Sequence, residues 1–223
     1  MTLGRPRLHL RATTSTNDRA RALATAGAPH GALVTAAEQS AGRGRQGRTW
    51  IAPPGRALLL SLLLRSYDPL LPLRGGLAVA DLAGDVARVK WPNDVLVDDR
   101  KLAGVLVEAR PQSGWAVLGI GVNVAVELAS LPPGLRAATL GRPPEALEEA
   151  LDELLVCLQH RLAEPAAACL TALRARDALL GRPLRWDGGT GVGAGIDDAG
   201  ALLVRLADAS LRTLEAGEVH LGV

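Results

Sequence analysis

The chain has 223 residues, of which 48% are hydrophobic and 22% charged, and its formal net charge is +2 at pH 7. This length suits one domain with a small appendage, and the composition excludes a disordered chain, a collagen-like chain and a disulfide-rich miniprotein. A net charge so close to zero gives no global field of the kind that marks nucleic-acid-binding proteins.

The first half of the chain predicts strands joined by a helix and a long loop. A Ser, Thr and Asn cluster at residues 14–17 opens a run rich in Ala, Leu and Arg, which is typical of a capped helix. The eight apolar residues 57–64 are too few to cross a membrane, which needs roughly 20, and they predict a strand buried on both faces. We expect strands at 8–11, 32–38 and 57–65, a helix at 14–26, a Gly/Arg loop at 39–49, and a short helix at 73–82 that Gly75 and Gly76 weaken.

The second half of the chain predicts a hairpin-rich sheet, then two helices, and then short β-like runs separated by glycines. We expect strands at 86–90, 95–97, 101–110 and 115–124, and helices at 145–163 and 165–180. Gly181 and Pro183 end the last helix, and short β-like runs follow, with the glycines of 188–195 interpreted as hairpin turns rather than as a phosphate loop. The expected domains are therefore 1–180 and a small β domain at 181–223, too small for a secure core unless it docks on the first.

The sequence also predicts a compartment. The first eleven residues hold no apolar segment, so we expect no secretory signal. Cys157 and Cys169 are too few for a zinc site and are interpreted as core thiols within helices. We expect a cytoplasmic protein without a membrane anchor.

The polar composition is unusual. Of the 25 basic residues only Lys90 and Lys101 are lysines, and asparagine occurs only as Asn17, Asn93 and Asn123. A coding bias explains this scarcity, and the residues that remain are candidates for positions where a substitute fails chemically.

The loop at residues 42–48 matches the pattern G-x-G-x-x-G. A dinucleotide fingerprint requires a helix directly after the glycines, and Pro53 and Pro54 forbid one here. The loop instead carries Arg43, Arg45 and Arg48, and guanidinium groups bind phosphate and carboxylate oxygens bidentately. A solvated basic loop and a nucleic-acid contact are the alternatives, although a chain with only four Trp, one Tyr and no Phe offers no evident stacking platform.

Three further segments carry chemistry-bearing residues. Asn93 and Asp94 end a strand and are either turn formers or neighbours of a polyphosphate–Mg²⁺ group. Lys101 begins a strand, where a lysine is ordinarily a solvated residue. Asn123 lies in an apolar stretch and must find either backbone partners or a ligand.

In their order along the chain these segments resemble the biotin protein ligases. The matching pieces are Ser15-Thr16-Asn17, Gln39 with the Gly/Arg loop and Trp50, residues 90–94, residues 101–104, and residues 121–123. The tail, at 195–204 and 217–219, is similar to that family's small C-terminal barrel. The resemblance covers nearly the whole chain and implies an α+β fold: a catalytic domain with a mixed sheet, like that of class II aminoacyl-tRNA synthetases, plus an SH3-like β-barrel.

The resemblance implies ATP-dependent activation of biotin to biotinyl-5′-AMP, and transfer of biotin to one lysine of the biotin carboxyl carrier protein. The implied ligands are biotin, ATP and Mg²⁺. The biotin-binding residues implied in this sequence are Ser15, Thr16, Asn17, Gln39, Arg43, Gly44, Arg45, Lys101 and Gly104. Those implied for ATP and the adenylate are Arg45, Arg48, Trp50, Lys90, Asn93, Asp94 and Asn123, with Asp94 beside Mg²⁺. Lys101, Arg45 and Arg48 are the implied catalytic residues.

Lys101 has a physical reason to remain a lysine in an arginine-rich chain. A carboxylate and an α-phosphate must approach within bonding distance, and their repulsion is severe where water is excluded. A compact ammonium between them would stabilise the charge of the transition state, and a planar guanidinium would not occupy the same place.

Some members of the family carry an N-terminal helix-turn-helix and repress transcription. Because few residues precede Ser15, we expect no DNA binding by that route. The sequence allows a homodimer. Two other functions stay open: a lipoate-type acyl-adenylate ligase, and a non-enzymatic RNA-binding module.

Overall fold

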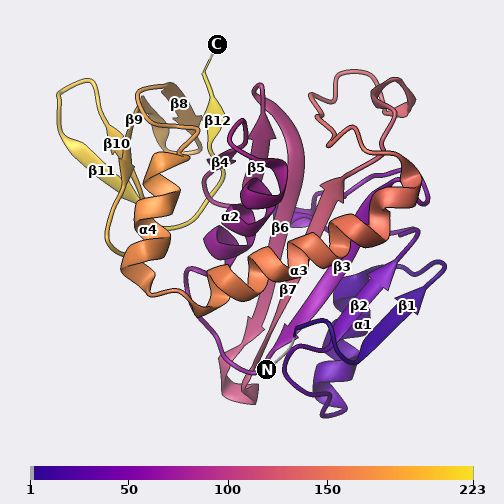
Figure 1. Cartoon of the computed structure of the whole chain (residues 1–223). Coiled ribbons are helices and arrows are strands. Elements are labelled where there is room, and N and C mark those ends of the chain that lie inside the picture. Colours follow the sequence, from indigo (N-terminus) through magenta and orange to yellow (C-terminus); the bar gives the residue numbers. More distant parts are fainter. Residues whose placement is uncertain (1–2, 223) are drawn as a thin grey trace.

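The computed structural model describes residues 3–222, and its twelve strands form two separate sheets (Figure 1). The larger sheet has the order β1-β2-β3-β7-β6-β5-β4, in which only the β1–β2 pair is parallel. This mixed sheet, together with its helices, confirms the expected α+β class. Its strands are β1 (Arg7–Leu10), β2 (Leu33–Ala36), β3 (Ala57–Leu64), β4 (Arg88–Lys90), β5 (Asp94–Val97), β6 (Arg100–Arg110) and β7 (Trp115–Asn123).

Four helices cover the larger sheet and connect it to the smaller one. They are α1 (Thr16–Thr25), α2 (Leu71–Ala83), α3 (Leu147–Ala163) and α4 (Ala166–Ala175), and α3 runs across the front of the sheet in Figure 1. Alternate residues of β3 separate the two faces, since side chains of a strand alternate. Leu60 and Leu62 belong to the main core with α2 and α3, whereas Leu63 packs with Ala20 and Ala24 of α1. Every residue of β3 is buried, as expected for the apolar run.

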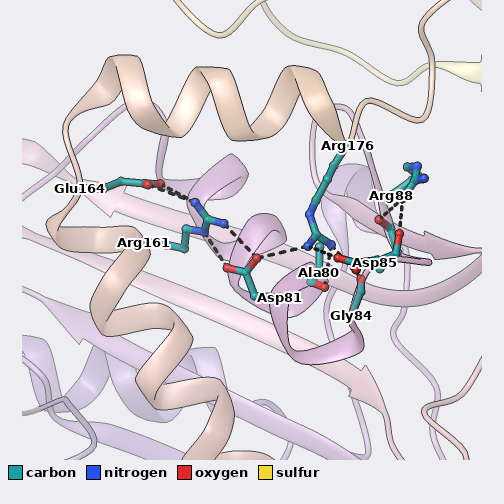
Figure 2. A network of polar contacts seen from close by, with 9 residues as sticks. Ala80, Asp81, Gly84, Asp85, Arg88, Arg161, Glu164 and Arg176 are labelled. Carbon is teal, nitrogen blue, oxygen red and sulfur yellow. Dashed lines mark hydrogen bonds and ion pairs between the residues drawn. The ribbon is translucent and has the colours of Figure 1, made fainter.

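The C-terminal end of α2 is held by an arginine of α3 and by one directly after α4 (Figure 2). Arg161 of α3 makes two hydrogen bonds to Asp81, at 2.6 and 2.9 Å, and Arg176 donates to the carbonyls of Ala80 and Gly84. Cations at this end of a helix complement its dipole and its unpaired carbonyls. The helical layer is thereby fixed as one unit.

All four predicted helices differ in length from those in the structure, and α4 differs most. Helix α2 is slightly longer than expected, and Gly75 and Gly76 do not interrupt it. Both face the sheet, where a Cβ atom would lie 3.1 Å from Val105 and 3.3 Å from Val89. Helix α4 ends at Ala175 instead of residue 180. The segment that follows is extended and pairs with the edge strand β4, since the Val89 amide donates to the Arg176 carbonyl and the Ala178 amide donates to the Val89 carbonyl.

The smaller sheet is antiparallel with the order β11-β10-β9-β8-β12. Its strands are β8 (Pro183–Trp186), β9 (Gly189–Ile196), β10 (Leu202–Arg205), β11 (Leu211–Leu214) and β12 (His220–Leu221). The expectation that the glycines of 188–195 form hairpin turns was wrong for most of them, because they lie within β9. Gly193 has no room for a side chain, since a Cβ atom there would lie 2.0 Å from the Leu179 carbonyl oxygen.

Polar contacts connect the larger sheet with the smaller one. The indole of Trp91 donates to the Gly200 carbonyl at 3.0 Å, and Arg182 pairs with Asp99. Cys157 and Cys169 are free thiols within α3 and α4, and burial raises the pKa of each. Within residues 3–222, no helix has the length and apolar character needed to cross a bilayer.

Candidate functional site

A cavity of about 560 Å³ opens on the α1 face of the larger sheet, opposite the face that α2 and α3 cover. Its walls come from the N-terminus of α1, the Gly/Arg loop, strands β6 and β7, the segment 131–137 and the tail. The structure brings every predicted site residue into this wall. They are Ser15, Thr16, Asn17, Gln39, Arg43, Gly44, Arg45, Arg48, Trp50, Lys90, Asn93, Asp94, Lys101, Gly104 and Asn123.

The N-terminus of α1 forms a buried neutral wall. Ser15 occupies the N-cap position but makes no side-chain cap, so the sequence pattern located the helix start without giving its cap. Gln39 supplies the bond instead: its Oε1 accepts from the Thr16 amide at 2.7 Å and lies 3.1 Å from the Thr16 hydroxyl. Gln39 therefore ties the start of the Gly/Arg loop to the helix.

A pair of glycines makes room for Trp50 on the sheet. Gly104 of β6 lies opposite Gly121 of β7 in the strand register. A Cβ atom on Gly121 would lie 2.5 Å from the Trp50 ring, and one on Gly104 would lie 3.3 Å from it. The indole thus lies directly against the backbone, where any larger residue would displace it.

The floor of the cavity holds two lysines and one carboxylate. Asp94 Oδ1 lies 2.7 Å from the Lys101 ammonium, and Asp94 Oδ2 lies 3.9 Å from the Lys90 ammonium. The first contact is an ion pair without the alignment of a hydrogen bond, since the buried Oδ1 has no hydrogen-bond partner among residues 3–222. Burial lowers the pKa of Lys90, which Asp94 opposes and the neighbouring Lys101 reinforces. Lys101 also lies 5.8 Å from the centre of the Trp50 ring.

Both asparagines on this floor donate hydrogen bonds to the backbone. Asn93 donates to the Val105 carbonyl at 2.9 Å, and Asn123 donates to the carbonyls of Ala138 at 2.9 Å and Lys101 at 3.4 Å. Backbone partners thus satisfy the amide of Asn123, one of the two alternatives left open by the sequence. Both side chains hold the segments around Lys101 in place.

The Gly/Arg loop folds back on itself as a hairpin with a single 3₁₀ turn at Arg45–Gly47. Gly42 and Trp50 approach so closely that a Cβ atom on Gly42 would lie 2.5 Å from the Trp50 carbonyl oxygen. No helix follows the glycines, so the loop is not a dinucleotide fingerprint.

Each arginine of the loop has a different anchor. Arg43 pairs with Asp18 of α1 at 2.9 Å, Arg45 donates to the Gly217 carbonyl at 3.2 Å, and Arg48 pairs with Glu218. Burial lowers the pKa of Arg45, and the charge of Arg48 lowers it further. The loop therefore connects the larger sheet with the C-terminal segment.

Several residues in or beside the site were not predicted as site residues from the sequence. Glu218 and His220 line the cavity from the tail, and Leu131 and Arg136 line it from a loop. Glu108, on β6, lies 2.8 Å from Arg21 and 3.7 Å from Arg43. The alternation of side chains along β6 could have identified Glu108, because it lies on the same face as Gly104. The four residues of the tail and the loop are distant in sequence from the predicted site residues, and no local pattern marks them as site residues.

Comparison with known proteins agrees with this geometry. Residues 10–124 match the model of the biotin/lipoate A/B protein ligase family. The biotin–[acetyl-CoA-carboxylase] ligase of Paracoccus denitrificans is 35% identical to this chain, over 94% of this chain and 98% of its own length. This chain belongs to the biotin/lipoate A/B protein ligase family.

Other members of the family extend the likeness. The corresponding ligase of Mycobacterium tuberculosis is 34% identical, over 94% of this chain and 86% of its own. A biotin protein ligase of Aquifex aeolicus, solved in complex with biotin and ATP, has a TM-score of 0.84 and 26% identity over 98% of this chain and all of its own. The resemblance and fold inferred from the ordered motifs are thereby confirmed.

Proposed function

We propose that this chain couples ATP to the activation of biotin as biotinyl-5′-AMP and then transfers biotin to a lysine of the biotin carboxyl carrier protein. The observation that carries the proposal is one cavity that joins a neutral hydrogen-bonding wall at Thr16 and Gln39 to a cationic floor at Lys90 and Lys101. The solved Aquifex relative was crystallised with biotin and ATP, and the Paracoccus relative is named for the carboxylase that it modifies.

The neutral wall suits the bicyclic ring of biotin, whose ureido group is its only strong hydrogen-bonding element. Ser15, Thr16, Asn17 and Gln39 are candidates to hold that ring, with Arg43 and Gly44 closing over it. A ring of this kind is fixed in an apolar pocket by a few well-placed polar partners. The valeryl chain then extends along Gly104 toward Lys101.

The reaction that we propose on the floor is an in-line displacement. An oxygen of the biotin carboxylate attacks the α-phosphorus of ATP, the bond to the bridging oxygen breaks, and pyrophosphate leaves with the bonding electrons. Lys101 would hold the carboxylate and an α-phosphate oxygen together, after exchanging its contact with Asp94 for the two anions.

The phosphates and the nucleotide would occupy the side of the cavity nearest the tail. Arg45, Arg48 and Lys90 supply positive charge there, and Trp50 offers a flat face beside Lys101. Asn93 and Asn123 would take part through the segments that their hydrogen bonds to backbone carbonyls hold.

Mg²⁺ would bind at this end chiefly through phosphate oxygens and water. Residues 3–222 contain no group of three or more His, Cys, Asp or Glu side chains that could hold a metal alone. The buried Oδ1 of Asp94, which lacks a hydrogen bond, fits one carboxylate contact to such an ion. When bound, the ion would neutralise charge on the phosphates.

In the second step the acceptor lysine, as a free amine, attacks the acyl carbon of the anhydride. The bond to the phosphate oxygen breaks, AMP leaves, and the ammonium proton of the new amide nitrogen is released. No covalent enzyme intermediate is needed, because the anhydride is already activated. The Gly/Arg loop would shield it from water until the carrier arrives.

Biotin-dependent exchange of labelled pyrophosphate into ATP tests the activation step. We expect exchange with biotin and none with lipoic acid at equal concentration, with carrier protein labelled only after biotin activation. Exchange with lipoic acid alone would assign the chain to the lipoate branch of its family, and the absence of exchange with either acid would contradict the proposal.

A further inference from the structure

Three fully or nearly fully buried polar side chains lie behind the neutral wall. Ser61 of β3 is 0% exposed, and Thr16 and Asn17 of α1 are each 4% exposed. The Ser61 hydroxyl lies 2.6 Å from Asn17 Oδ1 and 2.8 Å from the Thr16 hydroxyl oxygen. Asn17 Nδ2 in turn donates to Glu108 Oε2 at 2.7 Å. Glu108, Asn17, Ser61 and Thr16 thus form one continuous chain of hydrogen bonds.

The sheet is built to admit this chain. Ser61 lies opposite Gly119 of β7, which in turn lies opposite Leu106 of β6, so these three positions share the cavity face with Glu108. A Cβ atom on Gly119 would lie only 2.1 Å from Asn17 Oδ1. Glycine at this position therefore provides the space that the Asn17 side chain occupies.

The chemistry of the partners fixes where each hydrogen lies. The Glu108 carboxylate only accepts, so it takes a hydrogen of Asn17 Nδ2 and turns Asn17 Oδ1 toward Ser61. Oδ1 also only accepts, so the single hydroxyl hydrogen of Ser61 points to Asn17.

The Thr16 hydroxyl then has one favourable orientation. One hydroxyl hydrogen serves two neighbouring oxygens, Ser61 Oγ at 2.8 Å and Gln39 Oε1 at 3.1 Å, so one of the two contacts must lack a hydrogen. Repulsion between two oxygens is stronger at the shorter distance, so the hydrogen is better placed toward Ser61. A lone pair of Thr16 Oγ1 then faces Gln39 Oε1 across the 3.1 Å contact. The cavity wall thus presents two adjacent acceptors and no donor at this point.

We propose that Ser61, Asn17 and Glu108 are positioning residues that hold Thr16 as a hydrogen-bond acceptor, so that the site selects a ligand with an N–H group at this place. The inference rests on the proposed function, because the ureido ring of biotin supplies that N–H. The dithiolane ring of lipoate has no donor and would leave both oxygens buried and unpaired, which costs far more than a lost contact in water.

The test compares the wild-type chain with Ser61→Ala in biotin-dependent pyrophosphate exchange. Without Ser61 the Thr16 hydrogen turns to Gln39, and one acceptor is lost to the ligand. We expect the KM for biotin to rise about tenfold, the effect of one neutral hydrogen bond. We expect kcat to stay within about twofold, since the carboxylate reacts at the other end of the cavity. Ser66→Ala, an exposed serine just beyond the same strand, is the matched control.

Biotin methylated on one ureido nitrogen gives the readout that a merely structural role would not change. Both mono-N-methyl isomers are measured. The wild type should discriminate strongly against the isomer that lacks the N–H at Thr16, and Ser61→Ala should discriminate about tenfold less. Ser61→Cys, a volume-conserving change with a weaker donor and acceptor, should lie between the two and remains informative if the alanine variant folds poorly.

Three outcomes separate the two levels of inference. A wild type with no biotin-dependent exchange contradicts the proposed function itself. An active wild type with unchanged KM in both Ser61 variants overturns the positioning role. Equal loss for biotin and for both methylated isomers in those variants would assign Ser61 to folding alone, and would also overturn it.

Discussion

The two sides of the cavity are held by opposite kinds of interaction. The wall at Thr16, Asn17 and Ser61 is buried and held mainly by neutral hydrogen bonds. The arginine loop is exposed, with 43% of the Arg43 side chain and 49% of the Arg48 side chain accessible, and it is held by ion pairs to Asp18 and Glu218.

This difference matches the two halves of the substrate. Buried hydrogen bonds are costly to leave unmade, so they discriminate between a ligand that completes them and one that does not. Exposed ion pairs contribute little and are screened by salt, so the loop can exchange its carboxylates for phosphates at small cost. The buried wall is therefore suited to selecting the ligand, and the arginine loop is suited to moving when phosphates bind.

The largest effect is expected at Lys101, where the two sides meet. Lys101→Arg should lower pyrophosphate exchange at least a hundredfold, because a guanidinium cannot take the place of a compact ammonium between two anions. Arg100→Lys, the reverse change at the exposed neighbour, is the control and should leave exchange unchanged. Exchange at the wild-type rate in Lys101→Arg would contradict the assignment.

A smaller effect is expected when the neutral wall is displaced. Gly119→Ala places a methyl group where Asn17 Oδ1 now lies, at 2.1 Å. We expect the KM for biotin to rise roughly tenfold or more as the hydrogen-bond chain breaks. Gly76→Ala lies on the opposite face of the sheet, 3.3 Å from Val89, and should leave KM unchanged. Similar KM values in both variants would show that the wall tolerates displacement.

For the Gly/Arg loop we expect a change of a few-fold in the rate of proteolysis and no change in the choice between ligands. Glu218→Gln weakens the contact that holds Arg48, so trypsin should cleave at Arg43–Arg48 about two- to fivefold faster without ligand. Biotin with ATP should slow cleavage in the wild type and in Glu218→Gln. Glu215→Gln, a change at an exposed residue of the tail, serves as the control. Identical cleavage with and without ligands would contradict a closing loop.

The smallest effect is expected away from the cavity, at a buried polar atom that the fold leaves unpaired. Oδ2 of Asp177 has no partner among residues 3–222, and burial raises the pKa of this carboxyl. A raised pKa in the folded state favours the protonated form, so its contribution to stability is present below the unfolded value of about 3.9. The contribution is lost as pH rises through the folded value.

Asp177→Asn should therefore stabilise the chain at neutral pH, and this effect should become much smaller near pH 3, where the carboxyl is protonated. Urea unfolding at the two pH values measures the difference. Equal effects at both would mean that desolvation of the carboxylate is not the cause.

Much of the site could be predicted because its chemistry depends on residues that this chain otherwise lacks. Lys90, Lys101 and the three asparagines all lie in the cavity wall. However, the scarcity of lysine and asparagine indicated where the site lies and not what each of these residues does there. Asn93 and Asn123 bond to backbone carbonyls, and Asn17 bonds to Ser61 and Glu108 behind the wall.

The parts that the sequence did not predict depend on contacts between distant segments. Glu218 reaches the cavity only because the tail lies beside the Gly/Arg loop, so the resemblance of residues 217–219 to a family barrel did not identify it as a site residue. Helix α4 ends early because residues 176–178 pair with β4. Gly191 and Gly193 are strand residues because other backbone segments pass close to them, which no local turn pattern could indicate.

The most direct test of the account offers the chain both acids at once. The wild type is incubated with ATP, Mg²⁺ and equal concentrations of biotin and lipoic acid, and the enzyme-bound adenylates are identified by mass spectrometry. The account predicts biotinyl-5′-AMP alone, with none formed by Lys101→Ala. Accumulation of the lipoyl adenylate, or of no adenylate at all, would contradict it.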